Sequence, residues 1–310
     1  MKAARIHRFG PPEVIVVDDL PRPVPAAGQV LVRVANAGVG PWDALIREGK
    51  SIVNSPLPVT LGSDLSGVIE VLGSGVTQFQ PGDEVYGVTN AEFIGAYAEF
   101  ALASSKTVAR KPGGLSFTEA ASAPVVAVTA WQMLFDYAQA KPEQTVLIHG
   151  AGGNVGGYAV QLASQAGLHV FATASADDAQ YVRSLGVATV IDYERERFEE
   201  VIPKVDVVLD TVGGDTGRRS LKVIKPGGIL VSVVAERMPG PDELKNIRAV
   251  FFLVEVTTDR LDLITTLFNE GQLVPRVGTV LPLEQARTAH EMLGGAPHKR
   301  GKIVVSVANS

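Results

Sequence analysis

The sequence predicts an α/β protein with two domains, a small β-barrel and a doubly wound parallel sheet. Three observations lead to this prediction. The length of 310 residues suits about two domains of ordinary size. The first part of the chain carries short apolar or alternating runs divided by glycine and proline, which is typical of a β unit. Further on, apolar runs alternate with helical patterns, as they do in βαβ units.

The β unit begins near the N-terminus, where a cluster of prolines between residues 11 and 25 prevents long regular elements. Pro41 suits the first turn of a short helix that we expect over Trp42–Arg47. The strands expected in this unit are Val14–Val17, Val30–Val34, Val68–Leu72, Glu84–Val88 and Tyr97–Leu102.

The pattern changes near Ser116, where Ser116 and Glu119 have the spacing of a helix entry and Ala120–Gln139 has helical periodicity. From there to a helix at about Asp259–Glu270, strands and helices alternate. Near-continuous apolar strands suit a parallel sheet covered on both faces. The strands expected here are Thr145–His149, His169–Thr173, Thr189–Ile191, Asp206–Leu209, Ile229–Val233 and Ala249–Val254, and the intervening helices are Val155–Ala166, Asp177–Leu185 and Asp215–Val223.

The chain returns to β pattern at its end, in Val274–Leu281 and Lys302–Val307. Because short strands occur at both ends, we expect the last segment to rejoin the first domain. The predicted division is therefore residues 1–118 with 275–310 in the barrel domain, and residues 119–274 in the dinucleotide-binding domain.

Composition excludes several classes of protein. Hydrophobic residues make up 46% and charged residues 20%, as in a folded globular chain. The net charge of −5, with no long basic run, indicates no nucleic acid partner. The absence of cysteine and the scattered histidines predict that there is no metal site. Charges at the N-terminus exclude a signal peptide, and no apolar stretch is long enough for a membrane span, so we expect a cytoplasmic protein without membrane contact.

The most informative stretch is the glycine-rich turn after the expected strand Thr145–His149. It has the pattern A-x-G-x-x-G at Ala151, Gly153 and Gly156. Gly153 lets the backbone approach a pyrophosphate, and Gly156 lets the helix pack against the strand. N–H groups at Asn154 and Val155 would bind the anion together with the helix dipole. A merely structural glycine turn is the alternative, but the strand before it and the helix after it favour a dinucleotide site.

The residue at the end of the second strand of such a fold selects the dinucleotide. That position falls at Ser175, 24 residues after Ala151. Serine is small and neutral, and in place of an acid it predicts NADP(H). We expect Tyr193 to cover the adenine ribose from the other side. Asp177 and Asp178 would oppose a phosphate if they turned inward; alternatively, they begin the next helix, where acids are favoured.

Seven motifs occur along nearly the whole chain in one order: Gly38-Val39-Gly40-Pro41-Trp42-Asp43, Leu61-Gly62-Ser63-Asp64-Leu65-Ser66-Gly67, Gly82-Asp83-Glu84-Val85-Tyr86-Gly87, Thr129-Ala130-Trp131, Gly150–Gly156, Asp210-Thr211-Val212-Gly213-Gly214 and Pro226-Gly227-Gly228. With these motifs the chain resembles the medium-chain dehydrogenase/reductase superfamily, in its zinc-free NADPH:quinone oxidoreductase (zeta-crystallin-like) branch. The resemblance implies a GroES-like barrel domain, a Rossmann domain, and a nicotinamide bound in the cleft between them.

The chain also departs from its family pattern. Where zinc-containing relatives have a cysteine and a histidine–glutamate pair, this chain has Gly40 and Ser63-Asp64. The quinone oxidoreductase branch often has an asparagine at the place of Gly40 and a tyrosine at the place of Leu45, both facing the active site. It also often has a lysine just past Ser175 for the 2′-phosphate. Substrate recognition is therefore expected to differ.

The resemblance implies roles for further residues around the coenzyme. Thr129 would sit beside the nicotinamide or its ribose, although a helical threonine also commonly bonds to its own backbone. Val212 and Gly213 would pass near the coenzyme, and Leu253 would approach the nicotinamide carboxamide. Lys302 either reaches the cofactor or substrate, or is an exposed lysine that begins an edge strand.

The expected substrate side has two aromatic candidates. Trp42 and Tyr86 would line the pocket, but aromatic residues beside apolar strands also commonly belong to the core. Asp43 and Asp64 are interpreted as turn and cap residues, and His149 as structural.

These features predict NADPH-dependent reduction of small-molecule quinones or α,β-unsaturated carbonyls by hydride transfer without zinc. Conjugation in such acceptors spreads the developing negative charge onto oxygen, and no strong general acid is visible. Two alternatives stay open: a non-catalytic NADPH-binding sensor or interaction protein, and an NAD-dependent alcohol dehydrogenase. The apolar segment Arg248–Val254 is a candidate sheet edge that predicts a homodimer, unless a helix covers it.

Overall fold

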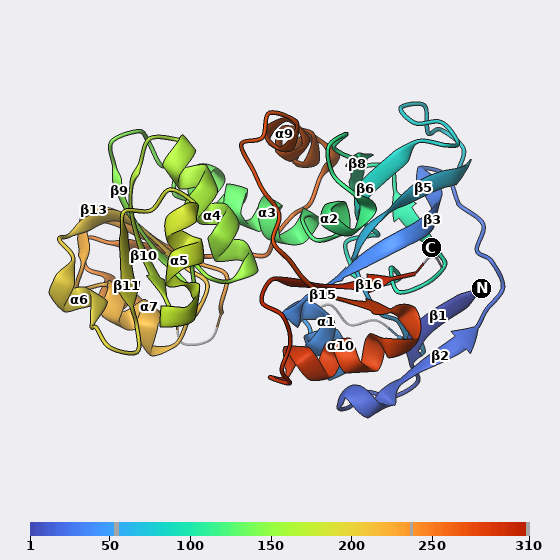
Figure 1. Cartoon of the computed structure of the whole chain (residues 1–310), viewed down its shortest axis with the longest axis horizontal. Coiled ribbons are helices and arrows are strands. Elements are labelled where there is room, and N and C mark those ends of the chain that lie inside the picture. The colour runs from blue at the N-terminus through green and yellow to red at the C-terminus, as the bar shows by residue number, and fades with distance from the viewer. Residues whose placement is uncertain (53–55, 236–237, 308–310) are drawn as a thin grey trace. The chain divides into compact units, whose positions relative to one another are not determined.

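The protein is described by a computed structural model that covers residues 1–52, 56–235 and 238–307, and the chain divides into two compact units (Figure 1). Unit 1 comprises Met1–Val125 and Glu255–Ser310, and unit 2 comprises Val126–Val254. Unit 1 is built on β-sheets and unit 2 on a parallel sheet with helices between its strands, so the predicted fold class is confirmed.

Unit 1 contains a seven-stranded and a three-stranded sheet. The seven-stranded order is β15-β16-β3-β5-β6-β8, with β7 paired to β3, and the three-stranded order is β2-β1-β4. Irregularities in its pairing with β5 bend the long strand β3 along the sheet. The strands are β1 (Lys2–Ile6), β2 (Ile15–Asp19), β3 (Gln29–Val39), β4 (Val59–Thr60), β5 (Asp64–Leu72), β6 (Glu84–Val88), β7 (Phe100–Ser104), β8 (Val108–Arg110), β15 (Val277–Pro282) and β16 (Lys302–Ser306).

Short helices cover the ends and edges of these sheets. Helix α1 begins at Pro41, as expected from a residue whose φ is already set for a first helical turn. Ser116 and Glu119 form a capping box at the start of α2. The helices of unit 1 are η1 (Pro12–Val14), α1 (Pro41–Arg47), α2 (Phe117–Ala121), α9 (Thr258–Asn269), η3 (Leu283–Gln285) and α10 (Ala286–Leu293).

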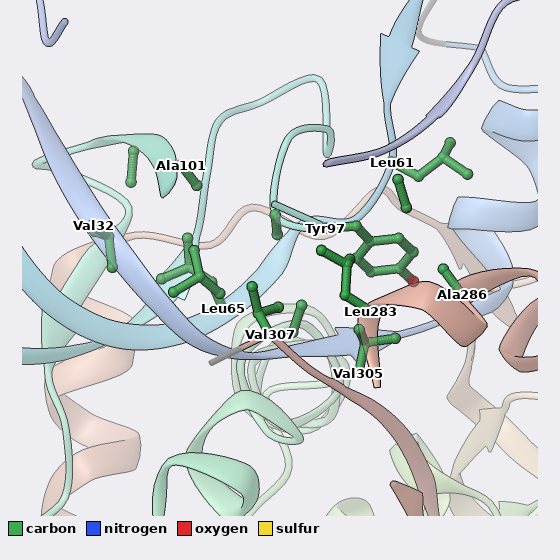
Figure 2. Packing of buried hydrophobic residues seen from close by; sticks show 14 of the residues in the cluster. Val32, Leu61, Leu65, Tyr97, Ala101, Leu283, Ala286, Val305 and Val307 are labelled. Atoms are coloured by element: carbon green, nitrogen blue, oxygen red, sulfur yellow. The ribbon is translucent and has the colours of Figure 1, made fainter. Parts of the chain in front are cut away.

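The core of unit 1 joins the beginning and the end of the chain. Figure 2 shows Leu61, Leu65 and Tyr97 from the first segment beside Ala286 and Val305 from the last. All five side chains are buried. Burial of this apolar surface holds the C-terminal segment in the first unit, which is where the sequence had suggested it returns.

Unit 2 is an open sheet of six parallel strands in the order β11-β10-β9-β12-β13-β14. Residues Val207, Val208 and Leu209 in β12 are all buried, as an apolar strand covered on both faces requires. The strands are β9 (Thr145–His149), β10 (His169–Ala174), β11 (Thr189–Asp192), β12 (Val205–Asp210), β13 (Ile224–Ser232) and β14 (Arg248–Phe251), and the helices are α4 (Asn154–Gln165), α5 (Ala176–Ser184), α6 (Phe198–Val201), α7 (Asp215–Ser220) and α8 (Pro241–Leu244).

The structure differs from the predicted division at both boundaries. Helix α9 was predicted in the second domain, but it belongs to unit 1. Its Thr258 hydroxyl donates to the carbonyl of Val108 at 2.8 Å, and its Leu261 carbonyl accepts from the Tyr86 hydroxyl at 2.9 Å. These contacts with β6 and β8 hold the helix to the barrel unit.

The helix expected over Ala120–Gln139 is divided in three. Helix α2 ends at Ala121, α3 (Pro124–Trp131) follows, and a π-helix (Gln132–Tyr137) continues it. Pro124 explains the first break, because proline has no N–H for a helical hydrogen bond and suits a first turn. Among the residues described, no helix has the length and apolar character needed to cross a membrane.

Candidate active site

The glycine-rich turn in unit 2 lies between the end of β9 and the start of α4. Gly150 has a φ of +70°, a conformation that favours glycine. A Cβ on Gly156 would stand 2.2 Å from the Gly150 carbonyl oxygen and 2.8 Å from Cα of Ala151. These two glycines therefore let the helix start directly against the strand end, which is the packing that the sequence predicts for Gly156.

The outer side of the same turn is open. Gly153 is exposed, and Asn154 and Val155 are only partly buried. Gly153 is the N-cap of α4 and has no side chain to satisfy the first N–H groups of the helix. A cradle of backbone at a helix N-terminus, with little side-chain bulk in front of it, fits a pyrophosphate. The residues of this turn thus suit the dinucleotide that the sequence predicts, and Ala151 lies buried beneath them.

The end of β10 places two further candidates beside the turn. Ser175 is the N-cap of α5, and its hydroxyl donates to Oδ2 of Asp178 at 3.3 Å. Asp178 is buried, and a Cβ on Gly152 would stand 2.7 Å from its carboxyl carbon. Asp177 is exposed. Both acids do lie in the first turn of α5, but Asp178 also turns inward against the glycine-rich turn.

The ends of β9 and β12 lie close together, and Tyr193 follows β11 near the end of β10. A Cβ on Gly150 would stand 3.2 Å from Cγ2 of Val212. The N–H groups of Val212 and Gly213 both donate to Oδ1 of Asp210 at 2.9 Å. The N–H of Tyr193 donates to the carbonyl of Ala174 at 3.3 Å. The structure therefore gathers Ser175, Tyr193, Val212 and Gly213 around the carboxyl ends of neighbouring parallel strands.

Two other predicted coenzyme contacts lie elsewhere in unit 2. Thr129 is buried in α3, and Leu253 is exposed in the segment after β14. Their roles stay predictions. His149 is a buried structural residue, as expected: its ring nitrogens lie 3.1 Å from the Thr173 hydroxyl and 2.9 Å from the Ser220 hydroxyl. Burial lowers the pKa of His149 to about 4, so the ring is neutral at physiological pH.

In unit 1, the indole of Trp42 occupies the space that a side chain at position 40 would need. A Cβ on Gly40 would stand 2.3 to 2.5 Å from three ring atoms of Trp42. The indole N–H donates to the Ser63 hydroxyl at 2.9 Å. The glycine at position 40 therefore has a definite structural consequence, since it admits this ring.

Lys302 is buried beside the same ring, and not exposed. Its Nζ lies 2.9 Å from Oδ2 of Asp64 and 4.4 Å from the centroid of a Trp42 ring. The side chains of Lys302 and Asp64 are 2% and 0% exposed. The interpretation as an exposed lysine on an edge strand was wrong, because β16 lies between β15 and β3 in the sheet. Contact of Lys302 with cofactor or substrate stays a prediction.

The two acids of this region have different roles. Asp43 caps α1 as expected, since its Oδ2 accepts from the Gly40 N–H at 2.8 Å and also from the Tyr97 hydroxyl at 3.1 Å. Burial raises the pKa of Asp43 to about 7. Asp64 starts β5 and lies in no turn, but its Oδ1 accepts from the N–H of Val125 in the first turn of α3, as a cap from a distant segment, while its Oδ2 accepts from Lys302. Burial also raises the pKa of Asp64, and Lys302 opposes that shift.

Tyr86 was predicted either to line the substrate pocket or to belong to the core, and the structure favours the core. Its side chain is completely buried. Its hydroxyl contacts the Leu261 carbonyl and the Thr265 hydroxyl in α9, both at 2.9 Å. Trp42, by contrast, is only partly buried.

The pairing of Asp64 with Lys302 was not predicted from the sequence, although a signal was present. Asp64 sits among apolar residues at the start of a strand, and a buried carboxylate needs a cationic or hydrogen-bonding partner. That requirement pointed to a buried cation, but only the fold identifies a residue 238 positions away as its source.

A zinc ion does not fit the donors in this region. Gly40 offers no ligand atom, the Ser63 hydroxyl accepts from Trp42, and both oxygens of Asp64 are engaged. Among the described residues, no group of three or more histidine, aspartate or glutamate side chains is arranged to hold a metal.

Comparison with known proteins identifies the family. Residues 26–113 match the alcohol dehydrogenase GroES-like domain, and residues 185–305 match the zinc-binding dehydrogenase family. The quinone oxidoreductase of Mus musculus is 32% identical over 325 residues, which cover 98% of this chain and 97% of the mouse protein. This chain belongs to the medium-chain dehydrogenase/reductase family. The resemblance predicted from the sequence motifs is thereby confirmed.

Two further relatives extend this similarity. The solved quinone oxidoreductase from Coxiella burnetii is 36% identical, with a TM-score of 0.91 over 99% of both chains. The 2-methylene-furan-3-one reductase of Solanum lycopersicum is 35% identical over 253 residues, covering 77% of this chain and 63% of that protein. Members of the quinone oxidoreductase group imply a nicotinamide coenzyme for this chain.

Proposed function

We propose that this oxidoreductase transfers a hydride from NADPH to a quinone or an α,β-unsaturated carbonyl, without zinc. The observation that carries the proposal is the open backbone turn of Gly150–Gly156, whose conformation suits a dinucleotide. Two kinds of relative support the acceptor class, since they are named for quinones and for a methylene group conjugated with a ketone.

The coenzyme would supply the hydride, and the chain would bind, orient and shield the reactants. In a quinone, the hydride and one proton together give the hydroquinone. In an enone, the hydride adds to the β-carbon, the charge moves to oxygen, and a proton from solvent completes the saturated carbonyl. Conjugation distributes the charge, so the reaction does not need a metal at the oxygen.

The acceptor assay tests this function directly. We expect NADPH oxidation with a quinone such as naphthoquinone and with an enal such as crotonaldehyde, unchanged after dialysis against a chelator. Loss of activity after dialysis, restored by zinc, would contradict the metal-free reaction. Tight NADPH binding without turnover on any quinone, enal or enone would favour the alternative of a sensor or interaction protein. If the only activity is the oxidation of secondary alcohols with NAD, the result would favour the alternative of an NAD-dependent alcohol dehydrogenase.

The choice of coenzyme has a second candidate, because one observation favours NADH. Ser175 is small and neutral, which supports NADPH. The buried carboxylate of Asp178 lies beside Ser175 and Gly152, and a carboxylate there would repel a 2′-phosphate and bind ribose hydroxyls. We therefore propose NADPH as hydride donor, with Asp178 weakening the preference so that NADH is also accepted.

Neighbouring aspartates give a matched test of the coenzyme. We expect Asp178→Asn to tighten NADPH binding roughly tenfold, as removal of one nearby like charge should, and to weaken NADH binding, because an amide accepts from the ribose hydroxyls less strongly than a carboxylate does. The exposed Asp177→Asn is the control and should change both affinities less than about twofold. Ser175→Asp should weaken the binding of NADPH. A large loss of NADH affinity in Asp178→Asn, with NADPH unchanged, would instead identify NADH as the coenzyme.

We further propose a homodimer located in the cytoplasm. Strand β14 is at the end of the sheet in unit 2, and Phe251 and Leu253 in this segment are exposed. An unprotected edge of this kind favours pairing with a second copy. Light scattering of the purified chain should give twice the mass of 32.7 kDa, and Phe251→Lys should reduce it to one copy.

A further inference from the structure

Helix α1 has a buried face that includes two charged residues, and an apolar face that reaches the surface. Asp43, Ile46 and Arg47 are buried, whereas Leu45 is 46% exposed and Trp42 is partly buried. Trp42 and Leu45 are three residues apart and therefore lie on the same side of the helix. The indole N–H is already bonded to Ser63, so this face offers carbon surface and no side-chain hydrogen-bond donor.

The orientation of the Trp42 ring is defined by contacts on three sides. Its N–H is bonded to Ser63, its benzene edge lies against Gly40, and the ammonium of Lys302 lies over a ring face. Asp64 in turn holds Lys302. A ring restrained in this way is preorganised, because little conformational entropy is lost when a ligand packs against it.

The polar groups common in the quinone oxidoreductase branch are missing at this place. The resemblance to that branch implies an asparagine and a tyrosine at the places where this chain has Gly40 and Leu45. In their place the chain presents an indole and an isobutyl group. An acceptor can therefore be recognised here by the shape and polarisability of a flat ring more readily than by a hydrogen bond to its oxygen.

We propose that Trp42 is a specificity-determining residue that selects planar ring acceptors, the quinones, over open-chain enals by stacking. The inference rests on the proposed function, since it divides the two acceptor classes named there. Ser63 and Lys302 act through Trp42 and are positioning residues. Stacking of two aromatic rings stabilises a complex beyond the burial of their surface, so binding of the flat acceptor is favoured on the order of tenfold.

The test compares naphthoquinone with crotonaldehyde in variants of this face. We expect Trp42→Leu to lower kcat/KM for naphthoquinone about tenfold and to change that for crotonaldehyde less than about twofold. Trp42→Phe keeps a ring and should restore most of the preference. Leu45→Ala is the matched control, which removes apolar surface without removing a ring and should affect both acceptors equally.

The variant Ser63→Ala tests whether Ser63 acts by positioning Trp42 and not in the reaction itself. Loss of the bond to the indole N–H should raise KM for naphthoquinone and leave kcat unchanged. The same variant should shift the emission of Trp42 in a Trp131→Phe background, where Trp42 is the remaining one of two tryptophans. An unchanged KM and emission would contradict the positioning role.

A binding measurement keeps this inference apart from the proposed function. In the Trp131→Phe background, naphthoquinone should quench Trp42 emission saturably without coenzyme, and crotonaldehyde should not. If the chain reduces no acceptor but this quenching occurs, the reductase proposal fails and the stacking surface stands. If the chain reduces both acceptors and Trp42→Leu lowers both activities equally, or if quenching is absent, the stacking proposal is overturned.

Discussion

The two regions proposed to bind the reactants are built in opposite ways. In unit 2, the turn at Gly150–Gly156 works by the absence of side chains, since a Cβ at Gly156 would lie 2.2 Å from a backbone oxygen. In unit 1, the region around Trp42 depends on side chains from distant segments, namely Ser63, Asp64 and Lys302. The first is a local backbone conformation, whereas the second is a tertiary arrangement of buried charge and aromatic surface.

This difference determines how each region should respond to substitution. The turn tolerates no added atom on its inner side, but its outer side is made of N–H groups that every residue except proline carries. The Trp42 region contains a buried ion pair, and removal of one partner leaves an uncompensated charge. We therefore expect large losses of stability in unit 1 and losses of binding in unit 2.

The largest expected effect is that of Lys302→Met. This variant leaves the fully buried carboxylate of Asp64 without its cation and should lower the free energy of unfolding by about 3–5 kcal/mol. Chemical denaturation of the protein, followed by the tryptophan emission of unit 1, measures this loss of stability.

Lys2→Met is the matched control for this variant. Lys2 pairs with Glu284 at 2.8 Å, close to the 2.9 Å of the buried pair, but both side chains are about half exposed. Its loss should change the free energy of unfolding far less than that of Lys302, because water screens an exposed ion pair. Equal effects of the two substitutions would contradict the stronger contribution expected of the buried ion pair.

The sequence predicts the backbone turn of the first region but not the buried ion pair of the second, for a physical reason. Gly153 and Gly156 were identified because their spacing directly specifies a backbone path between a strand and a helix. The burial of Lys302 depends on which strands flank β16, and on a carboxylate 238 residues away. The sequence around Lys302 indicates neither the flanking strands nor the carboxylate. An exposed lysine on an edge strand was therefore the interpretation that the local sequence favoured.

The inward turn of Asp178 was left undecided for a similar reason. An acid in the first turn of a helix is favoured by the helix dipole whether it faces solvent or not. Only the packing of α5 against the turn distinguishes the buried Asp178 from the exposed Asp177. The fold class and the succession of strands and helices along the chain needed no such information, because hydrophobic periodicity indicates them locally.

The stability of the folded chain should depend on pH through Asp43. Burial raises the pKa of Asp43 in the folded chain to about 7 from 3.8, while Lys302 and Tyr97 lower it and Asp64 raises it. An acid whose pKa is raised on folding contributes stability below pH 3.8 that is lost as the pH rises through 7. Asp43→Asn should therefore gain stability relative to the natural chain between pH 4 and pH 8, by a few kcal/mol.

The measurement is the difference in unfolding midpoint between this variant and the natural chain across that range. His290 provides a contrast, because burial lowers its pKa to about 3 and its contribution is lost as the pH falls below 6.5. A difference in unfolding midpoint between Asp43→Asn and the natural chain that stays constant across this pH range would contradict a raised pKa of Asp43 in the folded chain.

A smaller effect than those of Lys302→Met and Asp43→Asn is expected for Tyr86→Phe. The variant loses the hydrogen bonds to Leu261 and Thr265 and should cost about 1 kcal/mol of stability. As a core residue it should leave KM for every acceptor unchanged. A changed KM with unchanged stability would return Tyr86 to the wall of the substrate pocket.

The central claim is that the backbone turn of unit 2 holds the dinucleotide, and a titration with Gly156→Ala tests it most directly. The added methyl group would press against the Gly150 carbonyl, so NADPH and NADH binding, followed by nicotinamide fluorescence, should weaken at least tenfold. Gly113→Ala, which adds a methyl group with no atom within 4 Å, should bind both coenzymes as the natural chain does. Unchanged affinity in Gly156→Ala, with the fold intact by circular dichroism, would contradict the account.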